Sequence, residues 1–341
     1  MIPIYEKLVK TYPHASFYFS STSKTGYEEA KRRFTRGAEH FFLPLDFSWT
    51  MKSLVEAIKP TALILSESDF WYHLIQMVKR GGGKVIVLNG KLSKRSHRRF
   101  KKAAFFSEKL FAPVDLFCVQ NSEYQSRFSS LPISKERVVV TGNLKLAIKS
   151  ALPSSEEIDR FCRQYGIEKE DRLVTVGSTH AKEEELLGEQ LGQIPNVKFL
   201  LVPRHPERFK AVKKWLSNLG NDRIILIDQM GVLNLCYQLS EIALVGGSFA
   251  PGIGGHNIFE PIQAKIPVLF GPFMETQKEL VNMVLDAKAG LQIASDQVAS
   301  TINQLLSNSS PYKENAGKLS KVGQDVVNKT WGKLKQIVPC G

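Results

Sequence analysis

The sequence predicts an α/β protein built from two doubly wound domains. Short apolar runs alternate with segments of helical spacing along a chain of 341 residues, and this length corresponds to roughly two domains. Runs this apolar, each followed by a helix, are typical of strands that are buried on both faces of a parallel sheet. The runs fall into two sets, which favours two separate sheets over a single barrel.

The first set of expected strands covers residues 16–21, 62–67, 84–90, 116–121 and 138–143, and the second covers 172–178, 197–203, 223–228, 241–247 and 266–271. A polar, helix-forming segment near 150–166 separates the two sets. We therefore expect domains at residues 1–149 and 150–341. Residues 2–12 have the pattern of a helix that leads into the strand at 16–21. Because a doubly wound domain normally opens with a strand, the first domain is expected to lack its first strand.

Composition excludes several classes of protein. With 43% hydrophobic residues, the chain can bury a sizeable core. No stretch approaches the roughly 18 uncharged apolar residues of a membrane helix, and the N-terminus lacks the pattern of a signal peptide. The four cysteines are far apart, which favours reduced thiols over disulfides or a zinc site; they are Cys118, Cys162, Cys236 and Cys340. We therefore expect a cytoplasmic chain without a metal site.

The net positive charge of the chain comes entirely from its first half. The formal net charge is +13, and residues 1–150 carry 25 Lys and Arg against 12 Asp and Glu, whereas residues 151–341 carry 21 of each. The densest patch is Lys91, Lys94, Arg95, Arg98, Arg99, Lys101 and Lys102. Such a patch suits nucleic acid, anionic lipid headgroups or a phosphorylated substrate, and a solvated helix face is the alternative. The asymmetry between the halves favours an anionic partner.

A glycine-rich loop follows the expected strand at 241–247. Residues 246–261 read GGSFAPGIGGHNIFEP, and ligands of doubly wound sheets bind at the carboxyl ends of strands. We expect the backbone amides of this loop to cradle a phosphate. The segment HNIFEP is expected to open a helix whose N-terminus favours an anion. Glu260, in the first turn, is placed to accept the two hydroxyls of a ribose; the alternative is that it only complements the helix dipole.

Other expected strand ends carry polar candidates. Arg204, in PRHPE, is placed to grip a phosphate through two parallel hydrogen bonds, with an inter-element salt bridge as the alternative. His205 is either a ligand contact or a hydrogen-bonded turn residue. Thr179 and His180, in GSTH, are weaker candidates, and the acidic residues 183–185 are explained by a helix start. Together these residues favour a nucleotide site in the second domain.

The motifs together resemble the bacterial 3-deoxy-D-manno-octulosonic acid (Kdo) transferases of lipopolysaccharide assembly. The resemblance rests on SESDFW, NGKLSKRS, TGNLK, GSTHAKEEE, PRHPERF, GGSFAPGIGGHNIFEP and VLFGP. It runs in order from about residue 16 to the end and is greatest to chlamydial members. It implies a GT-B fold, in which two Rossmann-like domains face a cleft. It also implies the donor CMP-Kdo, a lipid A precursor as acceptor, and an inverting transfer without metal or cofactor at the cytoplasmic face of the bacterial inner membrane.

The resemblance also implies the donor-site residues. The family's CMP contacts fall on Pro203 and Arg204, on Met230, Gly231 and Val232, and on Asn257, Ile258, Phe259 and Glu260. Further possible donor contacts are Thr179, His180, His205, Gly247, Ser248 and His256. The family usually has an acidic residue at the position of Val232 and a glycine at the position of Lys182, so the chain departs from the pattern at both.

In the first domain the resemblance implies that Glu67 and Lys145 stabilise the transition state. A cation beside developing negative charge and a carboxylate near an oxocarbenium-like centre suit that role. The family's general base is a Glu in a Gly-Glu turn that precedes residue 1 of this chain, behind a membrane-anchoring segment.

The expected function is therefore that of a Kdo transferase with a basic acceptor domain and a neutral donor domain, bound to anionic lipid rather than nucleic acid. Because the family's general base is absent from residues 1–341, we expect the chain as given to transfer Kdo poorly. The alternative is a non-catalytic remnant that binds nucleotide or anionic lipid. Aromatic residues at 100–111 are expected to face the core rather than a membrane.

Overall fold

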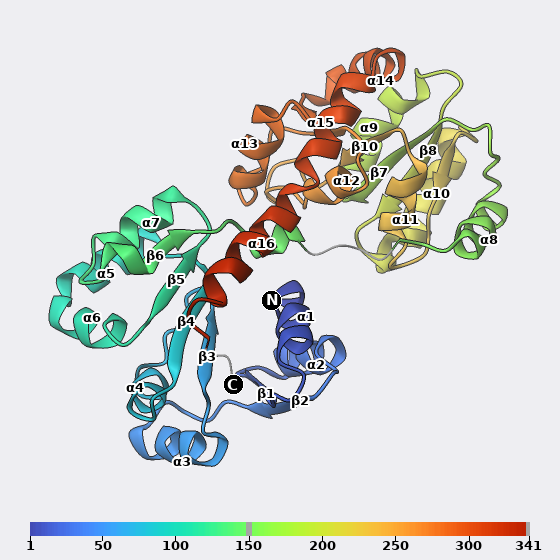
Figure 1. Ribbon diagram of the computed structural model, residues 1–341. Coiled ribbons are helices and arrows are strands. Elements are labelled where there is room, and N and C mark those ends of the chain that lie inside the picture. The colour runs from blue at the N-terminus through green and yellow to red at the C-terminus, as the bar shows by residue number, and fades with distance from the viewer. Residues whose placement is uncertain (148–151, 339–341) are drawn as a thin grey trace. The chain divides into compact units, whose positions relative to one another are not determined.

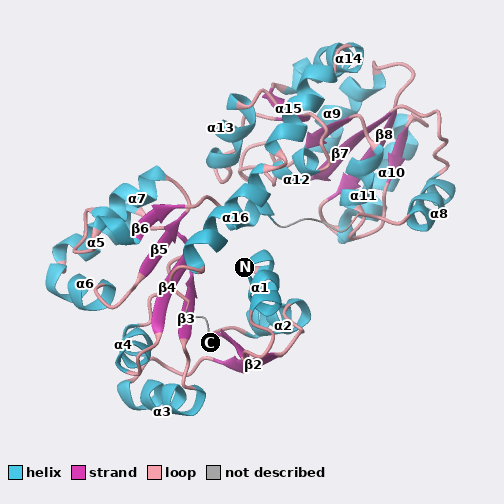
Figure 2. Cartoon of the chain, viewed as in Figure 1, coloured by secondary structure: helices cyan, strands magenta, loops and turns pink. Residues whose placement is uncertain are grey.

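The computed structural model describes residues 1–147 and 152–338 (Figure 1). The chain divides into two compact units, Met1–Ile148 with Val322–Gly341, and Lys149–Lys321. Each unit contains parallel strands with helices packed beside them (Figure 2). The expected α/β class is confirmed. The expected second domain extended to residue 341, whereas the segment from residue 322 onward belongs to the first unit.

Apolar burial explains why the C-terminal helix joins the first unit. Helix α16 (Val322–Leu334) buries Val326, Val327 and Leu334. These side chains pack in one cluster with residues of α1 (Ile2–Thr11) and of strand β4 (Lys84–Gly90). Gly323 lies against the backbone at Leu146, where an added Cβ would be 2.3 Å from the carbonyl oxygen. No local pattern in the sequence of this helix indicates that it packs on the first unit. The domain boundary near residue 322 was therefore not predictable from the sequence.

The strands of the first unit form two sheets. Strands β1 (Phe17–Ser21) and β2 (Ala38–Phe42) pair in parallel, and a separate parallel sheet has the order β3 (Ala62–Ser66), β4 (Lys84–Gly90), β5 (Leu116–Val119), β6 (Val138–Val140). Within the described residues no strand pairs with both β1 and β3. Strand β3 is accordingly only partly buried, whereas β4 is buried almost throughout.

Helices cover both sheets of the first unit. They are α2 (Lys24–Arg33), α3 (Ser48–Ile58), α4 (Tyr72–Arg80), α5 (Lys94–Lys102), α6 (Ala104–Phe111) and α7 (Ser122–Ser129). Val85 and Phe117 of the four-stranded sheet pack against Ile75 of α4 and Phe111 of α6. Beside the two-stranded sheet, the ring of Tyr5 meets several aromatic rings edge-on. The carboxyl ends of β3, β4 and β6 are thereby held at one edge of a packed sheet.

The second unit contains one parallel sheet. Its order is β12 (Gly290–Gln292), β11 (Val268–Phe270), β10 (Ile242–Val245), β7 (Leu173–Thr179), β8 (Lys198–Pro203), β9 (Ile224–Leu226). The helices are α8 (Ser155–Tyr165), α9 (Glu183–Gly192), α10 (Phe209–Leu219), α11 (Leu233–Leu239), α12 (Phe259–Gln263), α13 (Lys278–Asp286), α14 (Val298–Ser307) and α15 (Ser310–Leu319). The strand order reverses between β7 and β10, so a ligand site is expected outside the carboxyl ends of these strands.

The described cysteines are free thiols, of which Cys118 and Cys236 are buried. Burial raises the pKa of each of these two to about 12, so neither is a thiolate near neutral pH. Cys340 lies outside the described residues. Across residues 1–147 and 152–338, no helix combines the length and apolarity needed to cross a membrane.

Candidate active site

Side chains from three strand ends converge where the sheet order of the second unit reverses. His180 follows β7, Arg204 follows β8, and His256 lies in the loop that follows β10. The Nε2 atoms of His180 and His256 are 2.7 Å apart. Burial, together with the charges of His180 and Arg204, lowers the pKa of His256 to about 4. The expected candidates His180, Arg204 and His256 therefore form one electrostatic cluster.

Glu260 belongs to the same cluster. It lies in the first turn of α12, and Asn257 Nδ2 donates to its Oε1 at 3.1 Å. Burial raises the pKa of Glu260, while Asn257 and the charge of Arg204 act in the opposite direction. Helix α12 spans only Phe259–Gln263, and Asn257 Oδ1 already accepts from the amide of Phe259 at 3.0 Å. The structure thus gives no support to the expected anion site at this helix N-terminus.

The amides of the glycine-rich loop are already occupied by a protein carboxylate. Glu183 is completely buried. Its Oε2 accepts from the amide of Gly247 at 2.7 Å, and its Oε1 accepts from the amides of Ser248 at 2.9 Å and Phe249 at 2.8 Å. The amide of His180 donates to Oε2 at 3.1 Å. The expectation that these loop amides cradle a phosphate is therefore wrong for 247–249, because Glu183 takes the place of the anion.

The glycines of this loop permit close packing. Gly247 has φ of 68°, and a Cβ there would lie 2.6 Å from Cδ2 of His256. A Cβ at Gly246 would lie 2.8 Å from the carbonyl oxygen of Ser178. Ser248 is buried, with its hydroxyl donating to the carbonyl of Val245 at 2.6 Å. Gly247 and Ser248 therefore contribute to the site through their backbone. His256 fills the space where a side chain of residue 247 would lie, and the Ser248 hydroxyl bonds to the backbone of Val245.

Thr179 has a structural role in the described residues. Its buried hydroxyl donates to Glu184 Oε1 at 2.8 Å. Arg208 donates to both oxygens of Glu184, at 2.7 and 2.6 Å. The acidic first turn of α9 was expected only to complement the helix dipole, but Glu184 and its neighbour Glu183 are buried hydrogen-bond acceptors.

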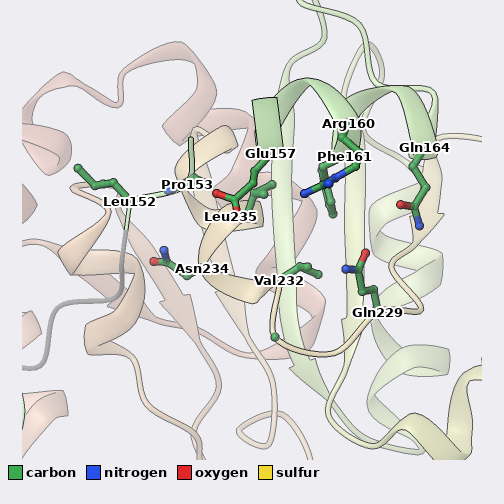
Figure 3. Close-up of a pocket in the computed structure, with 11 residues that line it drawn as sticks. Leu152, Pro153, Glu157, Arg160, Phe161, Gln164, Gln229, Val232, Asn234 and Leu235 are labelled. Atoms are coloured by element: carbon green, nitrogen blue, oxygen red, sulfur yellow. The ribbon is translucent and has the colours of Figure 1, made fainter. Parts of the chain in front are cut away.

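The segment 230–232 follows β9, the strand beside β8. Met230 is 57% exposed, Gly231 has φ of 85°, and Val232 is the residue before α11 and packs against the cluster that contains Phe161. A cavity of about 360 Å³ lies between this segment and α8 (Figure 3). It is lined by Leu152, Pro153, Glu157, Arg160, Phe161, Gln164, Gln229, Gly231, Val232, Asn234 and Leu235.

Remaining donor candidates differ in their exposure. Pro203 is buried at the end of β8, and Ile258 and Phe259 are also buried. Their side chains therefore support the backbone of the site. His205 is exposed and lies with its ring edge toward that of His180, at a centroid distance of 5.2 Å.

A second cluster lies at the strand ends of the first unit. Lys145 Nζ is 2.8 Å from Oε1 of Glu67, and Lys91 forms an ion pair with Oε2. Burial alone would raise the pKa of Glu67, but the hydrogen bonds and charges of Lys145 and Lys91 hold it below its ordinary value. The structure therefore brings the two expected residues Glu67 and Lys145 together. It adds Lys91, which was expected to belong to the basic patch.

Asn89 fixes this cluster and was not identified from the sequence. It is a buried residue near the end of β4, with φ of 56°. Its Oδ1 accepts from the amide of Leu144 at 2.9 Å, and its carbonyl accepts from Gln120 Nε2 at 3.0 Å. The first bond holds the 3-10 turn that carries Lys145. An Asn-Gly pair after an apolar run was the available signal, since Asn tolerates the left-handed conformation.

Comparison with known proteins assigns the family. The family model described as 3-deoxy-D-manno-octulosonic-acid transferase (kdotransferase) matches residues 1–148. The 3-deoxy-D-manno-octulosonic acid transferase of Chlamydia trachomatis serovar A is 33% identical over 359 residues, covering 100% of this chain and 83% of that protein. The chain belongs to the Kdo transferase family. The corresponding transferase of Haemophilus influenzae is 30% identical, over 98% of this chain and 82% of that protein.

Solved structures agree on the fold of this Kdo transferase. A glycosyltransferase of Rickettsia africae has a TM-score of 0.63 at 14% identity and covers 100% of this chain and 94% of its own. The UDP-GlcNAc 2-epimerase of Neisseria meningitidis has a TM-score of 0.67 at 15% identity, covering 98% and 96% respectively. The fold is therefore GT-B, and the chain is a glycosyltransferase of the Kdo transferase family.

The basic patch of this Kdo transferase lies on α5. Apart from Lys91, which pairs with Glu67, the residues of the patch all lie on α5 and are exposed; they are Lys94, Arg95, Arg98, Arg99, Lys101 and Lys102. On the adjoining helix α6, Phe105 is 72% and Phe106 is 46% exposed, whereas Phe111 is buried. The expectation that the aromatic residues of this segment face the core is therefore confirmed for Phe111 and wrong for Phe105 and Phe106. In the part of the chain that the structure describes, no three His, Cys, Asp or Glu side chains are placed to hold a metal ion.

Proposed function

We propose that this Kdo transferase transfers Kdo from CMP-Kdo to a lipid A precursor of the lipid IVA type, without a metal or another cofactor. The observation that carries the proposal is the cluster of Arg204, His256 and Glu260 at the point where the sheet order reverses. An exposed guanidinium beside a helix-start carboxylate suits a nucleotide, because the first pairs with phosphate and the second accepts ribose hydroxyls.

In the donor unit, Arg204 binds the phosphate and Glu260, held by Asn257, accepts the ribose hydroxyls. The loops after β8 and β9 leave neighbouring strands, so they lie side by side. The segment 230–232 and its cavity of about 360 Å³ then receive the base. A cavity of this size is at the lower end of the range for small-molecule sites.

In the acceptor unit, Lys145 and Glu67 supply fixed charges for the transfer. The oxygen of an acceptor hydroxyl loses its proton to solvent and forms a bond to the anomeric carbon of Kdo, while the bond from that carbon to the phosphate oxygen breaks and CMP leaves. An ammonium group stabilises developing negative charge, and a carboxylate stabilises an oxocarbenium-like centre. The ion pair between Lys145 and Glu67 fixes both charges before the substrate arrives.

The nucleotide site is tested by calorimetry of CMP binding. We expect Arg204→Ala to lose a charge-assisted contact of about 1.5–3 kcal/mol, or roughly 10- to 150-fold in affinity. Arg163→Ala is the matched control, since it removes an exposed arginine from α8 of the same unit. Equal CMP affinity in the two folded variants would contradict the assignment of Arg204.

Catalysis is tested by incubating the protein with CMP-Kdo and lipid IVA and reading the acceptor mass by mass spectrometry. A mass gain of one or more Kdo units in a minor fraction of the acceptor is the expected result, in line with the poor transfer expected from the sequence. Lys145→Met should lower turnover by about 10²–10³-fold, in line with the loss of one preorganised charge, while CMP affinity is retained. CMP binding by the unaltered chain without any mass gain would favour a nucleotide-binding protein that does not transfer sugar.

We further propose that the enzyme acts as a peripheral protein at the cytoplasmic face of the bacterial inner membrane. Helix α5 presents cations, and Phe105 and Phe106 stand exposed beside it. Anionic headgroups attract each such cation with about 1 kcal/mol. Exposed aromatic side chains also suit the boundary between headgroups and acyl chains. A nucleic acid partner is not required by this arrangement.

Vesicle binding tests the membrane proposal. The variant Arg98→Glu with Arg99→Glu should bind vesicles with 30% phosphatidylglycerol at least about tenfold more weakly, with CMP affinity unchanged. The control Lys213→Glu with Lys214→Glu makes the same charge change on exposed positions of α10. If both variants bind anionic vesicles like the parent at low salt, α5 is not the membrane contact.

A further inference from the structure

His180 contacts two other imidazole rings in the donor unit. The rings of His180 and His256 are nearly parallel, with centroids 5.0 Å apart and an interplanar angle of 12°, and His205 approaches His180 edge-on with centroids 5.2 Å apart. The Nε2–Nε2 distance of 2.7 Å between His180 and His256 is that of a hydrogen bond. One ring must donate through Nε2 and the other must accept, because two N–H groups cannot point at each other.

The surroundings of this pair oppose a positive charge on it. Burial is the largest cause that lowers the pKa of His180, and burial with the neighbouring charges lowers that of His256 to about 4. Arg204, Arg208 and His205 also oppose a positive charge on the pair.

Two carboxylates face the pair from α9, but both are engaged elsewhere. The charges of Glu183 and Glu184 act against this lowering at His180, although its pKa stays below the ordinary value. Glu183 is committed to backbone amides of the glycine-rich loop. Glu184 is committed to Arg208. Glu260, which shares the cluster with Arg204, has its pKa raised by burial. Neither of the two α9 carboxylates is therefore free to act as the counter-charge of a protonated pair.

We infer that His180 and His256 form a proton-sharing pair that takes up one proton from solvent when an anionic donor binds beside Arg204. This inference rests on the proposed function, because it assumes that the nucleotide phosphate occupies this site. In the neutral pair, the ring that donates through Nε2 has a bare Nδ1, whereas the accepting ring carries its proton on Nδ1. Protonation of the bare Nδ1 leaves the Nε2–H···Nε2 bond intact and gives the pair two outward donors.

The bound anion supplies the driving force for this proton. An opposite charge within about 4–6 Å favours the charged form of a titratable group, and the donor of the proposed reaction carries a phosphate and a sugar carboxylate. The site then gains positive charge only when an anion is present. Donor affinity should consequently rise as the pH falls, by up to about tenfold per pH unit for one linked proton. A neutral nucleoside should show no such dependence.

Calorimetry of CMP binding at pH 7.0, in buffers of different ionisation enthalpy, counts the protons taken up. We expect the unaltered protein to take up about 0.5–1 proton more than His256→Asn. The phosphate of CMP itself titrates near pH 6 in every experiment, so the difference between proteins isolates the pair. His14→Asn, at an exposed turn of the first unit, is the control and should match the unaltered protein.

The outcomes separate the inference from the proposed function. CMP binding with equal proton uptake in the unaltered protein and in folded His256→Asn overturns the inference and leaves the nucleotide site standing. Absence of CMP binding to the unaltered protein overturns both. If His256→Asn does not fold, the unaltered protein decides alone: CMP affinity that is constant between pH 7 and pH 8 overturns the inference, and affinity that weakens toward pH 8 supports it.

Discussion

Replacement of Glu183 by Gln is the sharpest test of how the donor site is built. Its Oε2 accepts from the amides of His180 and Gly247, and its Oε1 accepts from those of Ser248 and Phe249. Glutamine has nearly the same shape but offers one acceptor oxygen and one donor nitrogen. Two buried backbone amides would then face an N–H₂ group rather than an acceptor.

The magnitude follows from the number of amides left without a partner. A buried donor that loses its acceptor costs about 1–3 kcal/mol, so two of them cost about 2–6 kcal/mol. In a domain of 150–250 residues, 1 kcal/mol shifts the melting temperature by about 2–4 °C. We therefore expect Glu183→Gln to lower the Tm of the second unit by about 8–16 °C for a loss near 4 kcal/mol.

Differential scanning calorimetry measures this shift, and Glu185→Gln is the matched control. Glu185 lies in the same first turn of α9 and is exposed. Its replacement removes the same charge from the helix N-terminus, where a carboxylate contributes about 0.3–1 kcal/mol. If Glu183→Gln melts within 2 °C or so of Glu185→Gln, the dipole alone explains Glu183, and the hydrogen bonds to the loop amides do not stabilise the fold.

The remaining predictions concern backbone strain and acid stability. Lys182 has φ of 69° and ψ of −38°, a conformation that costs a residue with a side chain about 1–3 kcal/mol of strain. Lys182→Gly should relieve this strain, and the greater chain entropy of glycine offsets only about 0.5–1 kcal/mol of the gain. We therefore expect Lys182→Gly to raise the Tm. Lys214→Gly, inside α10, should lower the Tm, and the same sign for both would refute the strain argument. Because Lys145 and Lys91 hold the pKa of Glu67 low, the stability from this pair is present above the unfolded pKa of about 4.3 and is lost as the pH falls through the folded value. Urea unfolding between pH 5.5 and 3 should therefore depend less on pH in Lys145→Met than in the parent, and identical slopes would contradict the pairing.

The strands of the fold were largely predictable because burial on both faces leaves a local signature. All seven residues of β7 and all four of β10 are buried, and both were expected as apolar runs. Strand β2 was missed because AEHFF contains Glu39 and His40 and is only partly buried. Strand β12 was missed because GLQ contains a single large apolar residue. Short or mixed strands are specified by their neighbours in the sheet, which a local pattern does not contain.

The site positions were predictable from strand ends, but their partners were not. Arg204 was identified as a polar residue after an apolar run and Glu67 through the family resemblance, and both lie in clusters of charge. Glu183 was assigned to a helix dipole, yet its carboxylate bonds amides that lie 64 to 66 residues away in sequence. A first-turn Glu has the same local sequence in both roles. Only the packing of β7 against β10 distinguishes them.

Left-handed backbone conformations explain how separate strands build one site. Glu67 follows β3, and Asn89 and Ser178 are the last residues but one of β4 and β7; their φ values are 59°, 56° and 56°. Each such residue costs of order 1 kcal/mol or more when it is not glycine, so its surroundings must hold it. Lys145 and Lys91 hold the side chain of Glu67, and Asn89 is held through the bond to Leu144. The pairing register of β4 and β7 shifts where Asn89 and Ser178 lie, and such irregularities redirect the side chains near the strand ends. The sequence shows such a residue only as a polar residue near the end of a strand. It does not show the strained backbone or the long-range contacts that stabilise it.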